Sequence, residues 1–224
     1  MWISHRGVKV AVDRLVKIYV NDRLTAEVVT SPEGLQYLAW GYVQVYRLHG
    51  AEVAIEDSKI KIYIKDKFDV DKESFIDCGP VRQVVEKAAW RRKVRLEDLV
   101  ALAREFNKLT MPFIEPELAV HTAALYSRGS WVVVHDVSRH SAVLKLIGKA
   151  AVEGVSVQDS VAFTTGRASG DMVTRLASVG VSTLVSMRGP LASGVEAACR
   201  YGVVLVANVR SRGFTPLCGV EYLE

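Results

Sequence analysis

Long apolar runs and paired cysteines are both missing from this sequence. No uncharged apolar stretch approaches the roughly 18 to 20 residues that a membrane span needs, and the first residues lack the apolar core of a secretory signal. We therefore expect a cytoplasmic protein that does not associate with membranes. The three cysteines, Cys78, Cys199 and Cys218, are an odd number without a close pair. This argues against a disulfide framework and against a four-cysteine zinc site.

Signatures of common nucleotide and metal sites are also missing. The chain has neither the GxxxxGK[ST] phosphate loop nor the GxGxxG dinucleotide fingerprint. Zinc deaminases need a His-x-Glu and a Pro-Cys-x-x-Cys motif, whereas Thr122 and Ala123 follow His121 and no paired cysteines exist. A zinc hydrolase is therefore disfavoured, and we expect no tightly bound metal.

The composition is that of an ordinary globular protein. Half of the 224 residues are hydrophobic and about a quarter are charged, so a sizeable core can form and low-complexity classes are excluded. The net charge of +4 and the pI near 8.9 are mild, and the basic residues are spread along the chain. This mildly basic balance is compatible with an anionic ligand, and we expect no nucleic acid partner.

The first part of the chain has the pattern of two β-hairpins. Residues 15–20 and 25–30 are expected to be strands joined by the Asn21-Asp22 turn, because both turn residues tolerate left-handed backbone angles. Residues 52–64 alternate like a second hairpin. Paired hairpins of this kind indicate an antiparallel sheet.

A helix is expected between the hairpins. Pro32 opens it, and Ser31 is a plausible N-cap. Its apolar residues recur every three to four positions. Residues 1–66 are therefore predicted to be a small antiparallel β portion with one helix. The expected inward residues of the helix are Leu35, Leu38, Ala39, Tyr42 and Val45.

Residues 67–128 are expected to connect this portion to the rest through a cysteine loop and helices. Cys78 stands before Gly79-Pro80, where proline disfavours a helix and glycine relaxes the backbone, so an exposed loop is expected. Exposure is what a reactive thiol needs. A half-buried structural cysteine is the commoner fate, and the residues alone favour it. The predicted helices are residues 81–89, 96–109 and 117–126.

Residues 129–224 have the pattern of a three-layer α/β portion. Four apolar runs rich in β-branched residues follow Gly129, and a helical segment separates each run from the next. Strands buried on both faces read as continuous apolar runs, and their alternation with helices implies a parallel sheet. The four predicted strands are residues 131–134, 161–164, 183–185 and 203–207.

Basic residues follow each of these predicted strands. Ligands of open α/β sheets bind where the strands end, and arginine beside free helix N–H groups suits phosphate. Arginine is also common at surfaces, but its presence at all four ends favours an anion site. His140 is a candidate base or ligand, although a single helical histidine is more often structural. The residues after the strands include His135, Asp136, Arg139, His140, Thr165, Gly166, Arg167, Ser186, Arg188, Asn208, Arg210 and Arg212.

Two segments carry the most specific pattern in the sequence. Residues 165–173 read TGRASGDMV, and residues 136–148 read DVSRHSAVLKLIG. They resemble the TGRxSxDMV and DVGRHNAVDKxxG motifs of the formate dehydrogenase accessory sulfurtransferase family, the FdhD-like proteins. The order and spacing of the similarities cover nearly the whole chain. Weaker similarities lie at the Val20-Asn21 turn, the helix of residues 32–41, His121, the loop of residues 186–190 and Arg210.

The resemblance implies a cytidine-deaminase-like fold, a homodimer and a role in sulfur delivery. Sulfur would move from a cysteine desulfurase to the molybdenum or tungsten dinucleotide cofactor of formate dehydrogenase or a related oxidoreductase. Cys78 would carry it as a persulfide, since thiolate is the nucleophile in sulfur exchange. The substrate, molybdenum guanine dinucleotide, would bind in residues 129–224. The implied cofactor-binding residues are His121, Arg139, His140, Thr165, Gly166, Arg167, Ser169, Asp171, Ser186, Arg188 and Arg210.

The chain also departs from the family pattern. The family's CGxCG loop reads CGPVR here, so Val81 replaces the second cysteine. In the histidine segment, Ser138, Ser141 and Leu144 replace glycine, asparagine and aspartate. Two functions therefore stay open: a sulfur carrier, and a cofactor-binding chaperone without sulfur chemistry. A third possible function is a nucleotide-binding enzyme that acts on another substrate, but the sequence shows no residues that would catalyse such a reaction.

Overall fold

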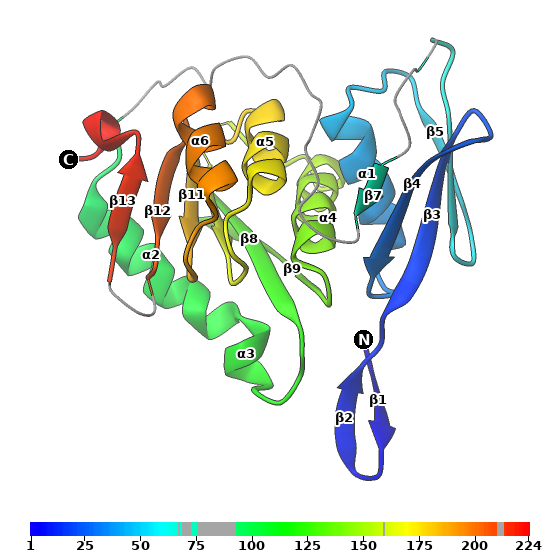
Figure 1. The fold of residues 1–224 in the computed structure, drawn as a ribbon, viewed down its shortest axis with the longest axis horizontal. Coiled ribbons are helices and arrows are strands. Elements are labelled where there is room, and N and C mark those ends of the chain that lie inside the picture. Colours follow the sequence, from blue (N-terminus) through cyan, green and yellow to red (C-terminus); the bar gives the residue numbers. More distant parts are fainter. Residues whose placement is uncertain (67, 69–72, 76–92, 159, 210–212) are drawn as a thin grey trace.

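The computed structural model describes residues 1–66, 68, 73–75, 93–158, 160–209 and 213–224. These residues form two lobes that lie side by side (Figure 1). Cys78, the predicted helix at residues 81–89, Arg210 and Arg212 lie outside the described residues. Within the described part, no helix is both long and apolar enough to cross a membrane.

The N-terminal lobe contains the two predicted hairpins. They are β3 with β4 and β5 with β6, and Asn21 and Asp22 turn the first with φ of 46° and 62°. The hairpins join through parallel pairing of β3 with β6, and β7 adds in parallel to β4, so the sheet is mixed, in the order β5-β6-β3-β4-β7. Its strands are β3 (Arg14–Val20), β4 (Arg23–Thr30), β5 (Glu52–Glu56), β6 (Lys59–Tyr63) and β7 (Glu73–Phe75).

A separate two-stranded arm precedes this sheet. β1 (Trp2–His5) and β2 (Val8–Ala11) pair antiparallel and project from the body of the molecule (Figure 1). Lys9 Nζ lies 2.6 Å from Glu115 Oε1, which ties β2 to the other lobe. The sequence pattern gives no strand prediction for the arm, because four-residue strands are too short for a clear period.

α1 (Leu35–Val45) is the predicted helix of this lobe, but it begins later than Pro32. Ser31 does not cap it, because the Ser31 N–H donates to the Asp136 carboxylate and the Ser31 hydroxyl accepts from the Val137 N–H. Gly34, with φ 71°, occupies the N-cap position instead. The expected inward residues are buried: Leu35, Leu38, Ala39, Tyr42 and Val45.

The C-terminal lobe is built on a six-stranded mixed sheet in the order β13-β12-β11-β10-β8-β9. β10, β11 and β12 are parallel, and β8 runs antiparallel to both β9 and β10. The four predicted runs are therefore strands that point in the same direction, although β8 separates β9 from the other three. The strands are β8 (His121–Ser127), β9 (Ser130–Asp136), β10 (Val161–Thr164), β11 (Thr183–Ser186), β12 (Val204–Ala207) and β13 (Thr215–Cys218).

The predicted helix at residues 117–126 is wrong. Most of this segment is β8, a central strand between β9 and β10. A short apolar run such as Ala123 to Leu125 fits a buried helix and a buried strand equally well, and its alanines favour a helix locally. Hydrogen-bonded pairing with β9 on one side and β10 on the other makes this segment a strand. The sheet of this lobe therefore begins before Gly129.

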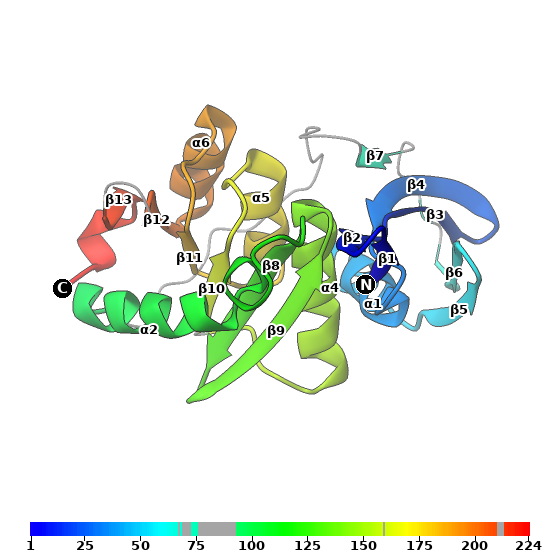
Figure 2. The same ribbon diagram turned by 90° about the horizontal axis from the view of Figure 1, so that it is seen from below.

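Helices cover both faces of this sheet (Figure 2). α2 packs Leu99, Ala103 and Phe106 against one face, where Phe163 and Val185 belong to the same core. α4, α5 and α6 lie on the opposite face. α2 confirms the prediction for residues 96–109. The helices are α2 (Leu96–Leu109), α3 (Met111–Ile114), α4 (Arg139–Val152), α5 (Gly170–Ser178) and α6 (Ala192–Tyr201), and a short 3₁₀ turn, Val220–Tyr222, follows β13.

Two glycines allow the lobes to pack closely through α1 and α4. A Cβ atom on Gly41 would overlap the carbonyl of Leu144, and one on Gly148 would overlap the carbonyl of Tyr37. The opposing atoms are backbone, which cannot move aside as a side chain could. Larger residues at these positions would force the lobes apart, so the helix contact depends on glycine.

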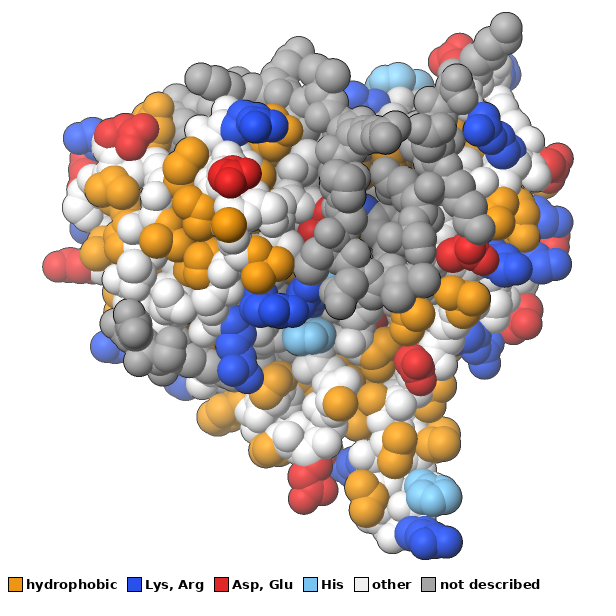
Figure 3. Space-filling view, in the orientation of Figure 1, with side chains coloured by type: hydrophobic (Ala, Val, Ile, Leu, Met, Phe, Trp, Pro, Cys, Tyr) orange, Lys and Arg blue, Asp and Glu red, His pale blue; other side chains and the backbone are white. Residues whose placement is uncertain are grey.

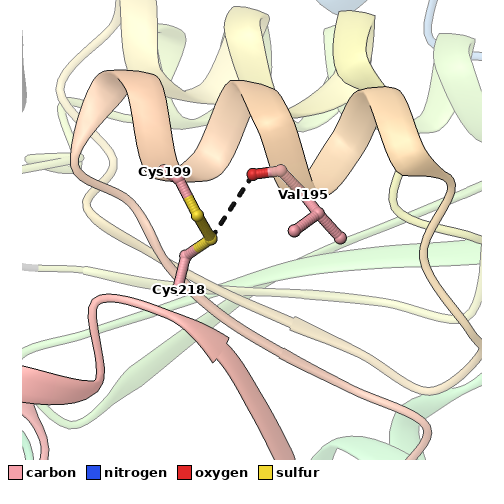
Figure 4. The surroundings of a disulfide bond; sticks show 3 residues. All are labelled: Val195, Cys199 and Cys218. Atoms are coloured by element: carbon pink, nitrogen blue, oxygen red, sulfur yellow. Dashed lines mark hydrogen bonds between the residues drawn. A yellow bond between two sulfur atoms is a disulfide. The ribbon is translucent and has the colours of Figure 1, made fainter.

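Cys199 and Cys218 form a disulfide, which corrects the expectation of a chain without one (Figure 4). Cys199 lies on α6 and Cys218 on β13, and their Cα atoms are 5.2 Å apart, within the range that a disulfide requires. Their separation of 19 residues hides the contact in the sequence. Packing of α6 over the sheet creates it. Cys199 itself is exposed on α6.

Candidate functional site

The carboxyl ends of β9, β10, β11 and β12 lie at one edge of the six-stranded sheet. β8 runs the other way, so its first residue, His121, comes to the same edge opposite Asp136. Figure 3 shows basic side chains gathered beside a histidine near the middle of this face. We call this region the carboxyl edge. It is formed by His121, Arg139, His140, Thr165, Gly166, Arg167, Ser169, Asp171, Ser186 and Arg188.

A buried polar cluster lies at the centre of the carboxyl edge. His140 Nε2, at the start of α4, lies 3.2 Å from Asp171 Oδ2, at the start of α5. The Ser169 hydroxyl donates to Asp171 Oδ1 at 2.5 Å and lies 3.5 Å from His140 Nε2. Ser169 occupies the predicted N-cap position of α5, but its side chain bonds to the carboxylate and makes no cap hydrogen bond to the backbone. The cluster therefore fixes the two helix N-termini relative to each other.

The charge of Asp171 is stabilised by its neighbours. Burial alone would raise the pKa of this carboxyl, but the hydrogen bond and charge of His140, with Arg175 and Ser169, lower the pKa to about 2. Arg175 Nε lies 4.0 Å from Asp171 Oδ2. Asp171 is thus an anion at neutral pH whose charge is already compensated inside the protein.

Gly166 and the N-terminus of α4 lie in close contact. A Cβ atom on Gly166 would approach Arg139 Cβ to 2.9 Å, so a larger residue here would displace the arginine. Arg139 Nε lies 3.4 Å from His140 Nε2. The glycine therefore allows Arg139 to lie across the end of β10.

The hydroxyls of Thr165 and Ser186 bond to backbone. Thr165 Oγ1 accepts from the Thr122 N–H at 2.9 Å, which locks the end of β10 to β8. Ser186 Oγ lies 2.8 Å from the Gly166 carbonyl and 2.9 Å from the Arg188 carbonyl. Both side chains shape the edge in this structure.

Cations dominate the solvent side of the edge. Arg167 and Arg188 are exposed and Arg139 is half-buried. Burial lowers the pKa of His121, and the charges of Arg139, His140 and Arg188 lower it further, against the opposite effect of Asp136. His121 is therefore neutral at neutral pH, and the surrounding field favours an anion.

Arg167 has no bonded partner among the residues that the structure describes. Within the described residues its guanidinium makes no hydrogen bond or ion pair. Asp171 binds His140 and Ser169 and does not pair with Arg167. Arg167 stands just ahead of Ser169 and α5, so a bound anion could meet both the guanidinium and the N-terminus of that helix.

The sequence interpretation missed a second polar feature, the Asp136–Lys145 pair. Lys145 Nζ donates to Asp136 Oδ2 at 2.6 Å and also to the carbonyls of Ser31 and Glu33 at 2.8 and 2.6 Å. Asp136 further accepts from the Thr30 hydroxyl at 2.7 Å and the Ser138 N–H at 2.8 Å.

Both members of this pair are fully buried. Burial lowers the pKa of Lys145, and Asp136 opposes that shift. The pair links the end of β4, in the N-terminal lobe, to the loop that starts α4. A lysine between Leu144 and Leu146, in the middle of an otherwise apolar helix segment, was the available signal.

His135 has a structural role beside the edge. Its Nδ1 lies 2.9 Å from Thr122 Oγ1, which accepts from the Met111 N–H at 2.8 Å. Burial and the charge of Lys149 lower the pKa of His135, so it is neutral at neutral pH. Within the described residues, no group of three His, Cys, Asp or Glu could hold a metal ion.

This architecture and site match a known family. The model of the FdhD/NarQ family matches residues 11–222. A sulfur carrier protein FdhD from Methanothermobacter thermautotrophicus is 30% identical, with 92% of this chain and 88% of that protein covered. One from Halalkalibacterium halodurans is 24% identical, over 93% of this chain and 86% of that protein.

A solved structure also has this fold. It is a putative formate dehydrogenase accessory protein from Desulfotalea psychrophila, with a TM-score of 0.78 and 22% identity. The similarity covers 100% of this chain and 97% of that chain. At this identity the likeness shows the fold alone. The family match over almost the entire length shows that the chain belongs to the FdhD/NarQ family.

Proposed function

We propose that this protein is a sulfur carrier in formate dehydrogenase maturation. The observation that carries the proposal is the family match over residues 11–222, which includes both the cysteine segment and the carboxyl edge. The sulfur would come from a cysteine desulfurase and go to the molybdenum or tungsten dinucleotide cofactor of formate dehydrogenase or a related oxidoreductase. We also propose the cytidine-deaminase-like layering and the homodimer that the family resemblance implies.

Cys78 is the proposed sulfur-carrying residue. Its thiolate attacks the terminal sulfur of a persulfide on the desulfurase, a Cys78–sulfur bond forms, and the desulfurase cysteine leaves as a thiolate. The Cys199–Cys218 disulfide supports this assignment, because sulfurs in a disulfide offer no thiolate. Cys78 is the remaining cysteine of the sequence.

The carboxyl edge is the proposed site for the guanine nucleotide part of the cofactor. Arg139, Arg167 and Arg188 supply positive charge, and the N-terminus of α5 adds partial positive charge beside Arg167. The buried Asp171 does not repel the phosphates strongly, because His140 and Arg175 compensate its charge. These features suit a diphosphate better than a neutral ligand.

A cofactor chaperone without sulfur transfer is the second candidate function. Val81 in place of the second loop cysteine favours it, since no neighbouring thiol of that loop can discharge a persulfide. In a sulfur carrier with one loop cysteine, release would depend on the cofactor or on an outside thiol.

Intact mass measurement separates the two functions. After incubation with a cysteine desulfurase and cysteine, wild type should gain the mass of one sulfur atom. The gain should vanish in Cys78→Ala and persist in Cys199→Ala and Cys218→Ala. If wild type gains no sulfur while a control acceptor does, the chaperone function replaces the sulfur carrier.

A further inference from the structure

The β1–β2 arm exposes an unusual number of apolar side chains. Ile3 and Val8 are 57% and 53% exposed, and Trp2 and Val10 are 46% and 42% exposed. A two-stranded hairpin is at best marginally stable alone in water, and three or more strands with an apolar face are needed for independent stability. The exposed apolar side chains of the arm are therefore those expected of strands that belong to a larger sheet.

One edge of the arm is free to pair. In the described part of the chain, β1 pairs with β2 and with no other strand. All four residues of β1 are exposed, whereas β2 alternates between exposed and half-buried residues and is tied to Glu115 through Lys9. The outer edge of β1 thus faces away from the protein body.

This edge lacks the charged residues and the proline that often prevent strand addition. Edge strands are usually protected by charged residues or proline. β5, at the edge of the N-terminal sheet, begins and ends with Glu52 and Glu56, and β13 contains Pro216. β1 reads Trp-Ile-Ser-His and has none of these. Unpaired N–H and C=O groups also disfavour insertion into lipid, so the edge suits a protein strand.

We propose that β1 pairs antiparallel with β1 of a second copy of this chain, which assigns a surface to the proposed homodimer. Antiparallel pairing about a twofold axis perpendicular to the sheet places Ile3 opposite its own copy. Val10 is the cross-strand partner of Ile3 within the arm. The four-stranded sheet then carries a continuous row of aliphatic side chains: Val10 and Ile3 of one copy, then Ile3 and Val10 of the other.

Charge favours a second copy as the occupant. β1 has no Lys, Arg, Asp or Glu, so its pairing with itself opposes no like-charged side chains. The strands are short, so we expect a weak, concentration-dependent dimer smaller than a standard interface.

Sedimentation equilibrium with two matched isoleucine variants tests this surface. Wild type should shift from monomer to dimer as concentration rises. Ile3→Lys should raise the dimer dissociation constant at least tenfold. Ile55→Lys should leave it unchanged, because Ile55 is an exposed isoleucine on the charged edge strand β5. A monomer at all concentrations, or a dimer that Ile3→Lys does not weaken, would overturn the proposal.

A crosslink tests the register even if Ile3→Lys folds poorly. In a Cys78→Ala background, Ile3→Cys should oxidise to a covalent dimer, because residues directly opposite on paired strands have Cβ atoms roughly 4.5 to 5.5 Å apart. Val8→Cys lies on β2, one strand further from the twofold axis, and should not form a covalent dimer. No covalent dimer from Ile3→Cys would contradict the register. Sulfur uptake by Cys78 in the Ile3→Lys variant is a separate readout, so failure of the surface and failure of the sulfur carrier are distinguishable.

Discussion

Charged groups occur in two contrasting settings at the carboxyl edge of the six-stranded sheet. Asp136 and Lys145 are fully buried and satisfied by each other and by residues of the N-terminal lobe. After β10 and β11, at the same edge of the sheet, Arg167 and Arg188 are exposed, and Arg167 has no hydrogen-bond or ion-pair partner in the described structure. Buried charges that are fully paired hold the lobes together. Exposed cations without partners are available to a ligand. Position in the fold, more than residue type, separates the two roles.

Breaking the buried pair should give the largest effect. Lys145→Met leaves the Asp136 carboxylate buried without its cation, and removing one partner of a buried pair costs about 3 to 5 kcal/mol of folding free energy. Urea unfolding of wild type and variant measures it. Lys108→Met, at an exposed site on α2, is the control and should change stability by about 0.5 kcal/mol or less. If the Lys145→Met variant were as stable as this control, the buried pair would not stabilise the fold, and its contrast with the exposed cations would fail.

Opening the disulfide should have the next largest effect. The Cys199–Cys218 bond closes a loop of 19 residues, for which the chain-entropy model gives about 3 kcal/mol. Unfolding with and without reductant should show this loss in wild type. A Cys199→Ser/Cys218→Ala variant should show no dependence on reductant. The bond lies away from the Asp136–Lys145 pair, so the two effects should add.

The Asp171 cluster should contribute a smaller, pH-dependent term. A pKa lowered from 3.8 to about 2 corresponds to roughly 2 to 3 kcal/mol of stability. Because the pKa is lower in the folded state, this stability is fully present above pH 4 and is lost as pH falls toward 2. Asp171→Asn should therefore be less stable than wild type at pH 7, and the difference should shrink between pH 4 and 2. If the stability difference between wild type and Asp171→Asn did not change with pH, the loss would come from packing and not from the charge of Asp171.

The sequence predicts well the elements whose local pattern agrees with their surroundings. The hairpin at Asn21-Asp22 and the helix Leu96–Leu109 follow from turn chemistry and helical period. β8 fails because its apolar run fits helix and strand alike, and only its two neighbouring strands decide. Ser31 fails as a cap because its hydroxyl accepts from the N–H of Val137, more than a hundred residues away in the chain.

The candidate site could be predicted only in part, for the same reason. Strand ends and the family motifs bring Arg139, Arg167 and Arg188 to one edge, which the sheet order confirms. The partners of each side chain depend on contacts between distant segments. His140 and Asp171 are the example: they start different helices, and the contact between their side chains cannot be read from spacing.

Calorimetric titration of guanosine diphosphate into wild type and Arg167→Ala tests the central claim that the exposed cations of the carboxyl edge bind the ligand. A charge-assisted contact is worth ~1.5 to 3 kcal/mol, so Arg167→Ala should weaken binding roughly tenfold to a hundredfold. Its melting temperature should stay that of wild type, since Arg167 is exposed and makes no bond in the described structure. Arg104→Ala, an exposed arginine of α2, should bind like wild type. Unchanged affinity with a lowered melting temperature in Arg167→Ala would contradict the account.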